Sequence, residues 1–143
     1  VSWDKVEIKR FRNDLYLLPK QKKWNAAQKI HWNLSQELKI PGLGIIKTQP
    51  QKARGIAKKY LLHGVEVGFR SYGERCHPQD RGGSHPLKKL FQEWNIPPWE
   101  RDKVPLIYIG NQLAAVVGYC VCQQFSVQNP EEEGVDFEVV STL

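Results

Sequence analysis

Apolar and polar residues alternate along much of this chain, which is the pattern of half-buried β-strands. The alternation predicts a hairpin over residues 3–18, with Asn13-Asp14 supplying the turn chemistry. It also predicts strands over residues 30–34 and 65–69. Residues 135–140 alternate once more, and we expect them to add an edge strand.

A second hairpin is predicted near the C-terminal third of the chain. Residues 106–109 form its first strand, and Gly110-Asn111 suits a tight turn. Its second strand, 113–121, is apolar on both faces. Such a strand must be covered by other elements on both sides.

One segment has the periodicity of a helix. Four apolar residues recur there at i, i+3, i+4 and i+7: Leu87, Leu90, Phe91 and Trp94. We expect Ser84 to cap its N-terminus, with Pro86 in the first turn. Asn95 suits the left-handed position after the last turn, and Pro97-Pro98 end the helix.

Residues 49–59 are basic and weakly patterned, and this composition predicts a linker or mobile loop. We therefore expect two small units, 1–48 and 49–143. The fold class is α+β, strand-rich, in two small lobes. The C-terminal lobe is expected to be a β-sheet layer packed with one principal amphipathic helix.

The chain has 143 residues, of which 41% are hydrophobic, enough for a core and unlike a disordered chain or a coiled coil. It has no Met and begins at Val1, so we expect a piece of a longer protein whose missing part lies upstream. Its longest apolar run, 113–121, is far shorter than the about 20 residues of a membrane helix, and residues 1–18 are too charged for a signal peptide. We expect no membrane partner.

Charge is distributed unevenly. Residues 1–89 carry 19 Lys and Arg against 7 Asp and Glu, whereas residues 90–143 carry 2 against 8. A basic segment interleaved with aromatic residues favours a polyanion partner, because Lys and Arg release counterions when they contact phosphates. The alternative, solvated charged faces without a partner, stays open. The acidic run Glu131–Glu133 is expected to be an exposed turn without an assigned function.

A phosphate site is predicted where Arg81-Gly82-Gly83-Ser84 leads into the helix carrying Lys88 and Lys89. Glycines allow close approach of a ligand, and a helix N-terminus offers unpaired N–H groups. The segment lacks the spacing of a P-loop. A capped surface helix with a solvated lysine pair is the alternative.

The three cysteines, Cys76, Cys120 and Cys122, fit neither a disulfide framework nor a zinc knuckle. This pattern favours a reducing cytoplasm. Cys120 and Cys122 are most simply small buried hydrophobic residues. Cys76-His77 with His85 lacks the further ligands of a zinc site and the base of a nucleophile, so we assign no metal and no catalytic residue.

Spaced motifs from Val65 onward carry a family resemblance. They are Val67-Gly68-Phe69-Arg70, Gly73-Glu74-Arg75, Pro78, Arg81-Gly82-Gly83-Ser84, Leu87-Lys88-Lys89-Leu90-Phe91, Ile96-Pro97-Pro98-Trp99-Glu100-Arg101, Pro105-Leu106 and Gly110. Over residues 49–140 the chain resembles the C-terminal tRNA-recognition domain of bacterial tRNA(Ile)-lysidine synthetases. Residues 11–17 resemble the end of the substrate-recognition domain that precedes it.

The resemblance implies an ATP-dependent ligase of the cytoplasm that joins lysine to the wobble cytidine of tRNA(Ile) with a CAU anticodon. ATP, with Mg, and lysine would bind an N-terminal domain whose Ser-Gly-Gly-x-Asp-Ser loop this sequence lacks. This part would hold tRNA(Ile), contain no cofactor and not be catalytic by itself; a homodimer is compatible with it. By matching position, the contact candidates are Arg70, Arg75, Arg81, Gly83, Ser84, Lys88, Lys89 and Arg101. The matching core residues are Leu87, Leu90, Phe91, Trp94 and Trp99.

Two other functions stay open at this point. One is a protein-interaction or structural domain whose basic face docks an acidic partner. The other is an enzyme complete in itself, using Cys76 with His77 or His85.

Overall fold

The computed structural model describes the backbone of residues 2–3, 6–11, 14–19, 29–70, 73–79 and 81–141, and side chains from residue 29 onward within those ranges. Its strands pair antiparallel in sheets of three, two, five and four strands. Strands with one principal α-helix confirm the predicted α+β class.

The N-terminal hairpin is confirmed. It consists of β2 (Val6–Phe11) and β3 (Asp14–Pro19), and the short strand β1 (Ser2–Trp3) pairs with β2 to complete a three-stranded sheet in the order β1-β2-β3. Phe11 pairs with Asp14, so Asp14 begins a strand instead of forming the turn. Asn13, the other predicted turn residue, lies outside the described residues.

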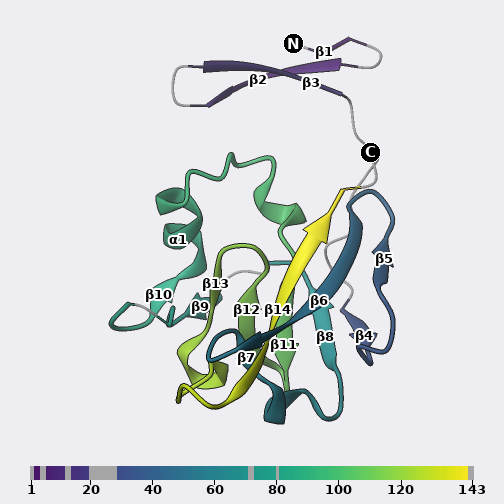
Figure 1. Cartoon of the computed structure of the whole chain (residues 1–143). Helices are drawn as coiled ribbons and strands as arrows, with labels where there is room; N and C mark the ends of the chain where they lie inside the picture. The colour runs from purple at the N-terminus through teal and green to yellow at the C-terminus, as the bar shows by residue number, and fades with distance from the viewer. Residues whose placement is uncertain are drawn as a thin grey trace.

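The central layer is a five-stranded sheet with the order β13-β12-β11-β8-β4 (Figure 1). Its strands are β4 (Ile30–Trp32), β8 (Val65–Gly68), β11 (Leu106–Ile109), β12 (Gln112–Val116) and β13 (Cys120–Val121). The strands predicted over residues 30–34 and 65–69 are thus present as β4 and β8.

The second large sheet has the order β5-β6-β14-β7. Its strands are β5 (Leu38–Ile40), β6 (Gly44–Lys52), β7 (Ile56–Ala57) and β14 (Glu133–Val140). β6 and β14 pair from Glu133 opposite Lys52 to Val140 opposite Ile45. The predicted edge position of β14 is wrong, because β14 lies between β6 and β7.

The predicted linker over residues 49–59 is also wrong. Residues 49–52 complete β6, β7 follows, and the 3-10 helix η1 (Lys58–Leu61) comes directly after it. The expected boundary between residues 48 and 49 falls inside β6, which pairs with β14 on both sides of that point. Strands before and after residue 48 therefore belong to one sheet.

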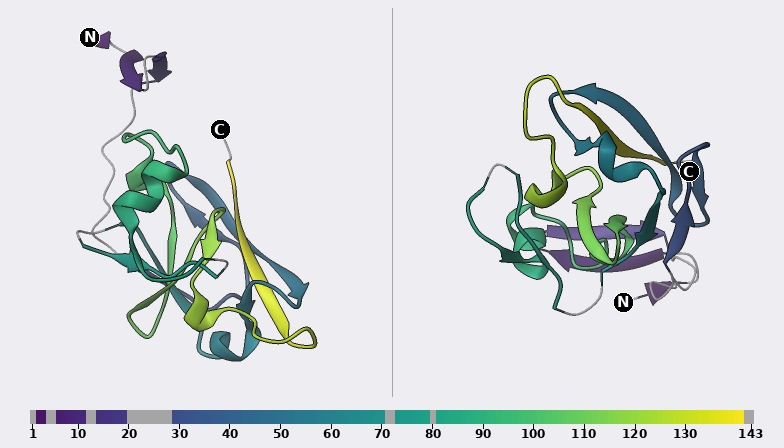
Figure 2. Two further views of the ribbon diagram at one scale, coloured as in Figure 1. Left: turned by 90° about the vertical axis from the view of Figure 1, so that its left-hand side faces the viewer. Right: turned by 90° about the horizontal axis from the view of Figure 1, so that it is seen from below.

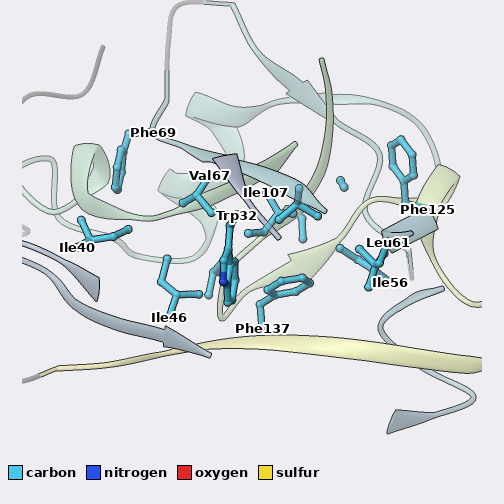
Figure 3. Packing of buried hydrophobic residues seen from close by; sticks show 14 residues of the cluster. Trp32, Ile40, Ile46, Ile56, Leu61, Val67, Phe69, Ile107, Phe125 and Phe137 are labelled. Carbon is cyan, nitrogen blue, oxygen red and sulfur yellow. The ribbon is translucent and has the colours of Figure 1, made fainter. Parts of the chain in front are cut away.

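The main core lies between these two sheets (Figure 3). Trp32 of β4 meets Phe137 of β14 edge to face, with ring centroids 5.8 Å apart. Val67 and Ile107 from the central sheet and Ile46 from β6 are fully buried in the same cluster. These contacts join residues from both halves of the sequence.

β11 is apolar on both faces, and each face has its own core. Ile107 points into the cluster between the sheets, whereas Leu106 and Tyr108 pack in a second cluster with the helix. Figure 2 shows that the helix α1 and the four-stranded sheet lie on opposite sides of the central strands. The predicted second strand, 113–121, is covered on both sides as expected, because Ala114 and Val117 lie in the first cluster and Leu113 and Val116 in the second.

The helix α1 (Leu87–Glu93) follows the short paired strands β9 (Arg75–Cys76) and β10 (His85–Pro86). Leu90 and Phe91 are fully buried, as predicted. Asn95 has φ of 58°. Its amide donates to the carbonyl of Gln92, and the amide of Ile96 donates to the carbonyl of Phe91. This is the Schellman ending expected from Asn95. The 3-10 helix η2 (Arg101–Lys103) precedes β11.

The turn of the second hairpin is as predicted, with positive φ at both Gly110 and Asn111. Its second strand is shorter than expected. β12 ends at Val116, residues 117–119 form a turn with Gly118 at φ of 86°, and β13 then turns back along β12. The apolar run 113–121 is therefore two strands, followed by the 3-10 helix η3 (Gln123–Phe125).

Candidate nucleic-acid interface

Arg75 and Ser84 form one polar unit at the start of the helical segment. The Arg75 side chain donates from Nε to the Ser84 hydroxyl (3.1 Å) and from Nη2 to its carbonyl (2.9 Å). The predicted helix cap at Ser84 is wrong, since α1 begins at Leu87 with Pro86 as its N-cap and has no side-chain cap bond. The amide of Leu87 donates to the carbonyl of Glu74 (2.8 Å) instead.

The short helix therefore does not present a phosphate cradle of the predicted kind. Gly82 and Gly83 lie in an exposed loop, and a Cβ at either would meet no atom within 4 Å. Gly83 has φ of 81°, a conformation that favours glycine. The loop is open to a ligand, but its geometry comes from the Arg75–Ser84 unit and not from a helix N-terminus.

Arg81 is held at the other end of this loop by Glu93 on α1. Both terminal nitrogens of Arg81 donate to the Glu93 carboxylate, the second at 3.1 Å. The pKa of Glu93 is lowered chiefly by that bond and further by the charges of Lys89 and His85. Of the side chains that the structure describes, the charges of Arg81 and Lys89 are thus set against the one carboxylate of Glu93.

Lys88 and Lys89 are exposed on α1, opposite its buried face of Leu87, Leu90 and Phe91. Neither lysine has an ion-pair partner among the described side chains. Of the predicted contact candidates, these two are the cations most available to a ligand.

The other two predicted arginines are engaged within the fold. Arg70 donates from Nε to Asp102 (2.7 Å), and its guanidinium lies 5.8 Å from the Phe91 ring centroid. Arg101 is 8% exposed and donates from Nε to the carbonyl of Ile96 (2.8 Å). Its burial makes Arg101 a residue that stabilises the loop after the helix, which disfavours its predicted RNA contact.

Ion pairs in the fold bring the basic part of the sequence together with the acidic part. Each of the six pairs among the described side chains joins a base before residue 90 to an acid after it. They are Lys47–Glu138, Arg54–Asp136, Lys58–Glu133, Lys59–Glu132, Arg70–Asp102 and Arg81–Glu93. The acidic run after Pro130 thus neutralises the lysines of η1. The partners of these pairs lie far apart in the sequence, so the sequence alone did not predict them. Because the pairs neutralise several lysines and arginines, the basic surface is smaller than the composition suggests.

Sequence reasoning missed a group of three thiols. Cys76 on β9 lies 2.7 Å from Cys122 and 3.7 Å from Cys120, sulfur to sulfur, and all three are free cysteines. The bridge between Pro78 and Cys122 brings β9 alongside the end of β13. The hydrogen bond with Cys120 lowers the pKa of Cys76, but the bond with Cys122 and burial together raise it to about 12.

Sequence reasoning also missed the contact between Trp94 and Tyr119. Their rings stack with centroids 5.1 Å apart and planes 20° from parallel. Trp94 directly follows α1 and is half-buried, whereas Tyr119 is 46% exposed in the turn after β12. Trp99, the other tryptophan predicted for the core, is also half-buried. A strand through residue 119, as predicted, would not have placed its ring there.

The part of the chain that the structure describes lacks both a metal-binding cluster and a membrane-spanning helix. No set of three or more His, Cys, Asp or Glu side chains there is arranged to hold a metal ion. No helix there has the length and apolar content needed to cross a bilayer.

Comparisons with known proteins agree on one family. The family model described as TilS substrate C-terminal domain matches residues 65–138. The chain is 45% identical over 139 residues to a tRNA(Ile)-lysidine synthase of Coxiella burnetii and 41% identical over 133 residues to one of Legionella pneumophila. These matches cover 96% and 92% of this chain but 31% and 30% of the relatives.

A solved structure supports the fold. The crystal structure of a TilS C-terminal domain superimposes with a TM-score of 0.61 at 18% sequence identity. The match covers 80% of this chain and all of that structure.

Proposed function

Because the chain belongs to the TilS substrate C-terminal domain family, we propose that it holds tRNA(Ile) for a tRNA(Ile)-lysidine synthase. The whole enzyme would join lysine to the wobble cytidine of a tRNA with a CAU anticodon. ATP, with Mg, would adenylate the cytosine C2 oxygen and release pyrophosphate, and the lysine ε-amine would then displace AMP. The 143 residues contain no Ser-Gly-Gly-x-Asp-Ser loop, so ATP and lysine would bind elsewhere in the enzyme.

The observation that carries this proposal is the exposed Lys88–Lys89 pair on a helix whose other face is buried. Leu90 and Phe91 anchor the helix in the core, so the two ammonium groups have a fixed base from which to reach a phosphate backbone. Each such contact releases condensed counterions, which provides most of the affinity of a weakly specific RNA site.

The Arg75–Ser84 unit holds the loop that precedes α1, next to the two lysines in the sequence. Its hydrogen bonds fix the loop that carries Gly83, whose main chain is open to an approaching ligand. Arg81 and Lys89 add positive charge beside it. Arg75, Arg81, Gly83, Ser84 and the two lysines therefore form one continuous segment of the proposed interface, with Arg70 at its margin and Arg101 outside it.

The proposal is tested by titrating tRNA(Ile) into this chain at several salt concentrations. Lys88→Ala with Lys89→Ala should weaken binding and reduce the magnitude of the slope of log K against log[salt] by about 2. The matched control replaces another adjacent pair, Lys58 and Lys59, which are already paired with Glu133 and Glu132.

The control pair should change the slope much less, because those lysines have acidic partners within the fold. Equal effects of both double variants would reduce the proposal to general charge attraction. No binding of tRNA by the folded chain would favour the alternative function, a domain that docks another protein.

A further inference from the structure

The stacked rings of Trp94 and Tyr119 form a wall of a small hollow beside α1. Its volume is about 200 Å³. Pro78, Gln79, Arg81 and Leu90 contribute to the remaining walls. We call this cavity the Tyr119 hollow. Two aromatic rings, an aliphatic floor, a guanidinium and an amide are the groups that proteins use to hold a planar, polar-edged ring.

Charge around the Tyr119 hollow is complementary to a phosphate. Arg81 lines it, and Lys89 and His85 lie close enough to lower the pKa of Glu93, the carboxylate that holds Arg81. Among the described side chains, the guanidinium of Arg81 and the ammonium of Lys89 are thus set against the one carboxylate of Glu93. A nucleotide placed here would have its phosphate close to the guanidinium of Arg81.

A second, wider groove of about 720 Å³ shares Trp94 and Tyr119 but has a different charge. Glu100, Lys103 and Glu138 line it, and Glu138 is also paired with Lys47. The two carboxylates there are balanced by two ammonium groups, so this groove offers a phosphodiester no excess positive charge, whereas Arg81 lines the Tyr119 hollow.

From these observations we infer that the Tyr119 hollow binds an unpaired nucleobase of the bound RNA, packed against the Trp94–Tyr119 pair. This inference rests on the proposed function and deepens it, because it adds the binding of an unpaired base to the contacts that the lysines make with the phosphate backbone. Every base has a π-face, so stacking here would tolerate different bases. Gln79 would then hydrogen-bond the base edge, because the terminal nitrogens of Arg81 are bonded to Glu93.

The test compares two RNA hairpins with the same stem, one blunt and one with a short unpaired 3′ overhang. Tyr119→Ala should lower the affinity of this chain for the overhang hairpin about 10-fold and leave the blunt hairpin unchanged. Tyr119→Phe keeps the ring and should retain the preference. Leu62→Ala is the matched control, because Leu62 is another exposed apolar side chain, far from the hollow in the sequence.

A 2-aminopurine in the overhang gives an independent signal. Its fluorescence should fall on binding to the unchanged chain and fall less with Tyr119→Ala, since stacking quenches it. Urea unfolding of each variant checks that the fold is intact. Wild-type affinity of folded Tyr119→Ala for the overhang hairpin would overturn the inference while leaving the proposed function standing. Failure of the unchanged chain to bind either hairpin or tRNA would overturn both.

Discussion

The hydroxyl of Tyr108 on β11 donates a hydrogen bond to the carboxylate of Glu74, just before β9. The carbonyl of Glu74 in turn accepts the amide of Leu87, the first residue of α1. Tyr108 is 5% exposed, and its ring also lies 4.1 Å from the Lys29 ammonium. One residue of the central sheet therefore positions the start of the helix that carries the candidate lysines.

Tyr108→Phe should lower the free energy of unfolding by about 1 kcal/mol, the usual contribution of one hydrogen bond. The ring stays in place, so packing is retained and only the bond to Glu74 is lost. Urea unfolding measures the change. Tyr119→Phe is the control, because its hydroxyl lies on an exposed ring. Equal stabilities of Tyr108→Phe and the unchanged chain would show that the Glu74 bond contributes nothing.

The cysteine group predicts a loss of stability in alkali. The pKa of Cys76 is raised from 9.0 to about 12 by its bond with Cys122 and by burial, which together outweigh the lowering by Cys120. Above pH 9.0 the unfolded chain loses this proton while the folded chain keeps it, so stability falls as pH rises towards 12.

The measurement is the urea midpoint from below pH 9.0 upwards, for the unchanged chain and Cys76→Ala. The variant should be less stable at neutral pH because of the cavity it creates, but its stability should fall less steeply with pH. Parallel pH profiles would contradict the role given to this thiol.

Local features of this fold could be predicted from the sequence because neighbouring residues determine them. The helix spacing from Leu87 to Trp94, its ending at Asn95 and the turn at Gly110-Asn111 each depend on only a few adjacent residues. Their φ angles and hydrogen bonds are set by residue type.

Features that depend on distant partners could not be predicted in this way. Residues 49–52 have a weak pattern of their own, yet they form a strand because β14 pairs with them from the far end of the chain. Ser84 has the sequence signal of a helix cap. In the fold, however, the pairing of β9 with β10 places Arg75 beside Ser84, and the Ser84 hydroxyl accepts from Arg75 instead of from a helix amide. The contact of Trp94 with Tyr119 likewise depends on the turn at Gly118.

Glu132 predicts a loss of stability in acid. Its pKa is lowered from 4.5, first by the amide of Gln128 and then by Lys59. The stability that it adds is present above pH 4.5 and is lost as pH falls through its lower folded value. Glu132→Gln should therefore flatten the acid arm of the stability profile. Glu131→Gln, a change at its exposed neighbour, is the control and should leave that arm unchanged.

The paired glycines before Ser84 separate backbone strain from ligand contact. A Cβ on either would meet no atom within 4 Å, but only Gly83 has a positive φ, at 81°. Gly83→Ala should therefore lower the free energy of unfolding by about 1 kcal/mol, whereas Gly82→Ala should leave it equal or raise it slightly. If RNA approaches this main chain, both methyl groups should weaken tRNA binding, including the one that leaves stability intact. Urea unfolding and tRNA titration of the two variants give both values. Unchanged affinity of Gly82→Ala and Gly83→Ala would remove the loop from the interface and leave Lys88 and Lys89 as its main contacts.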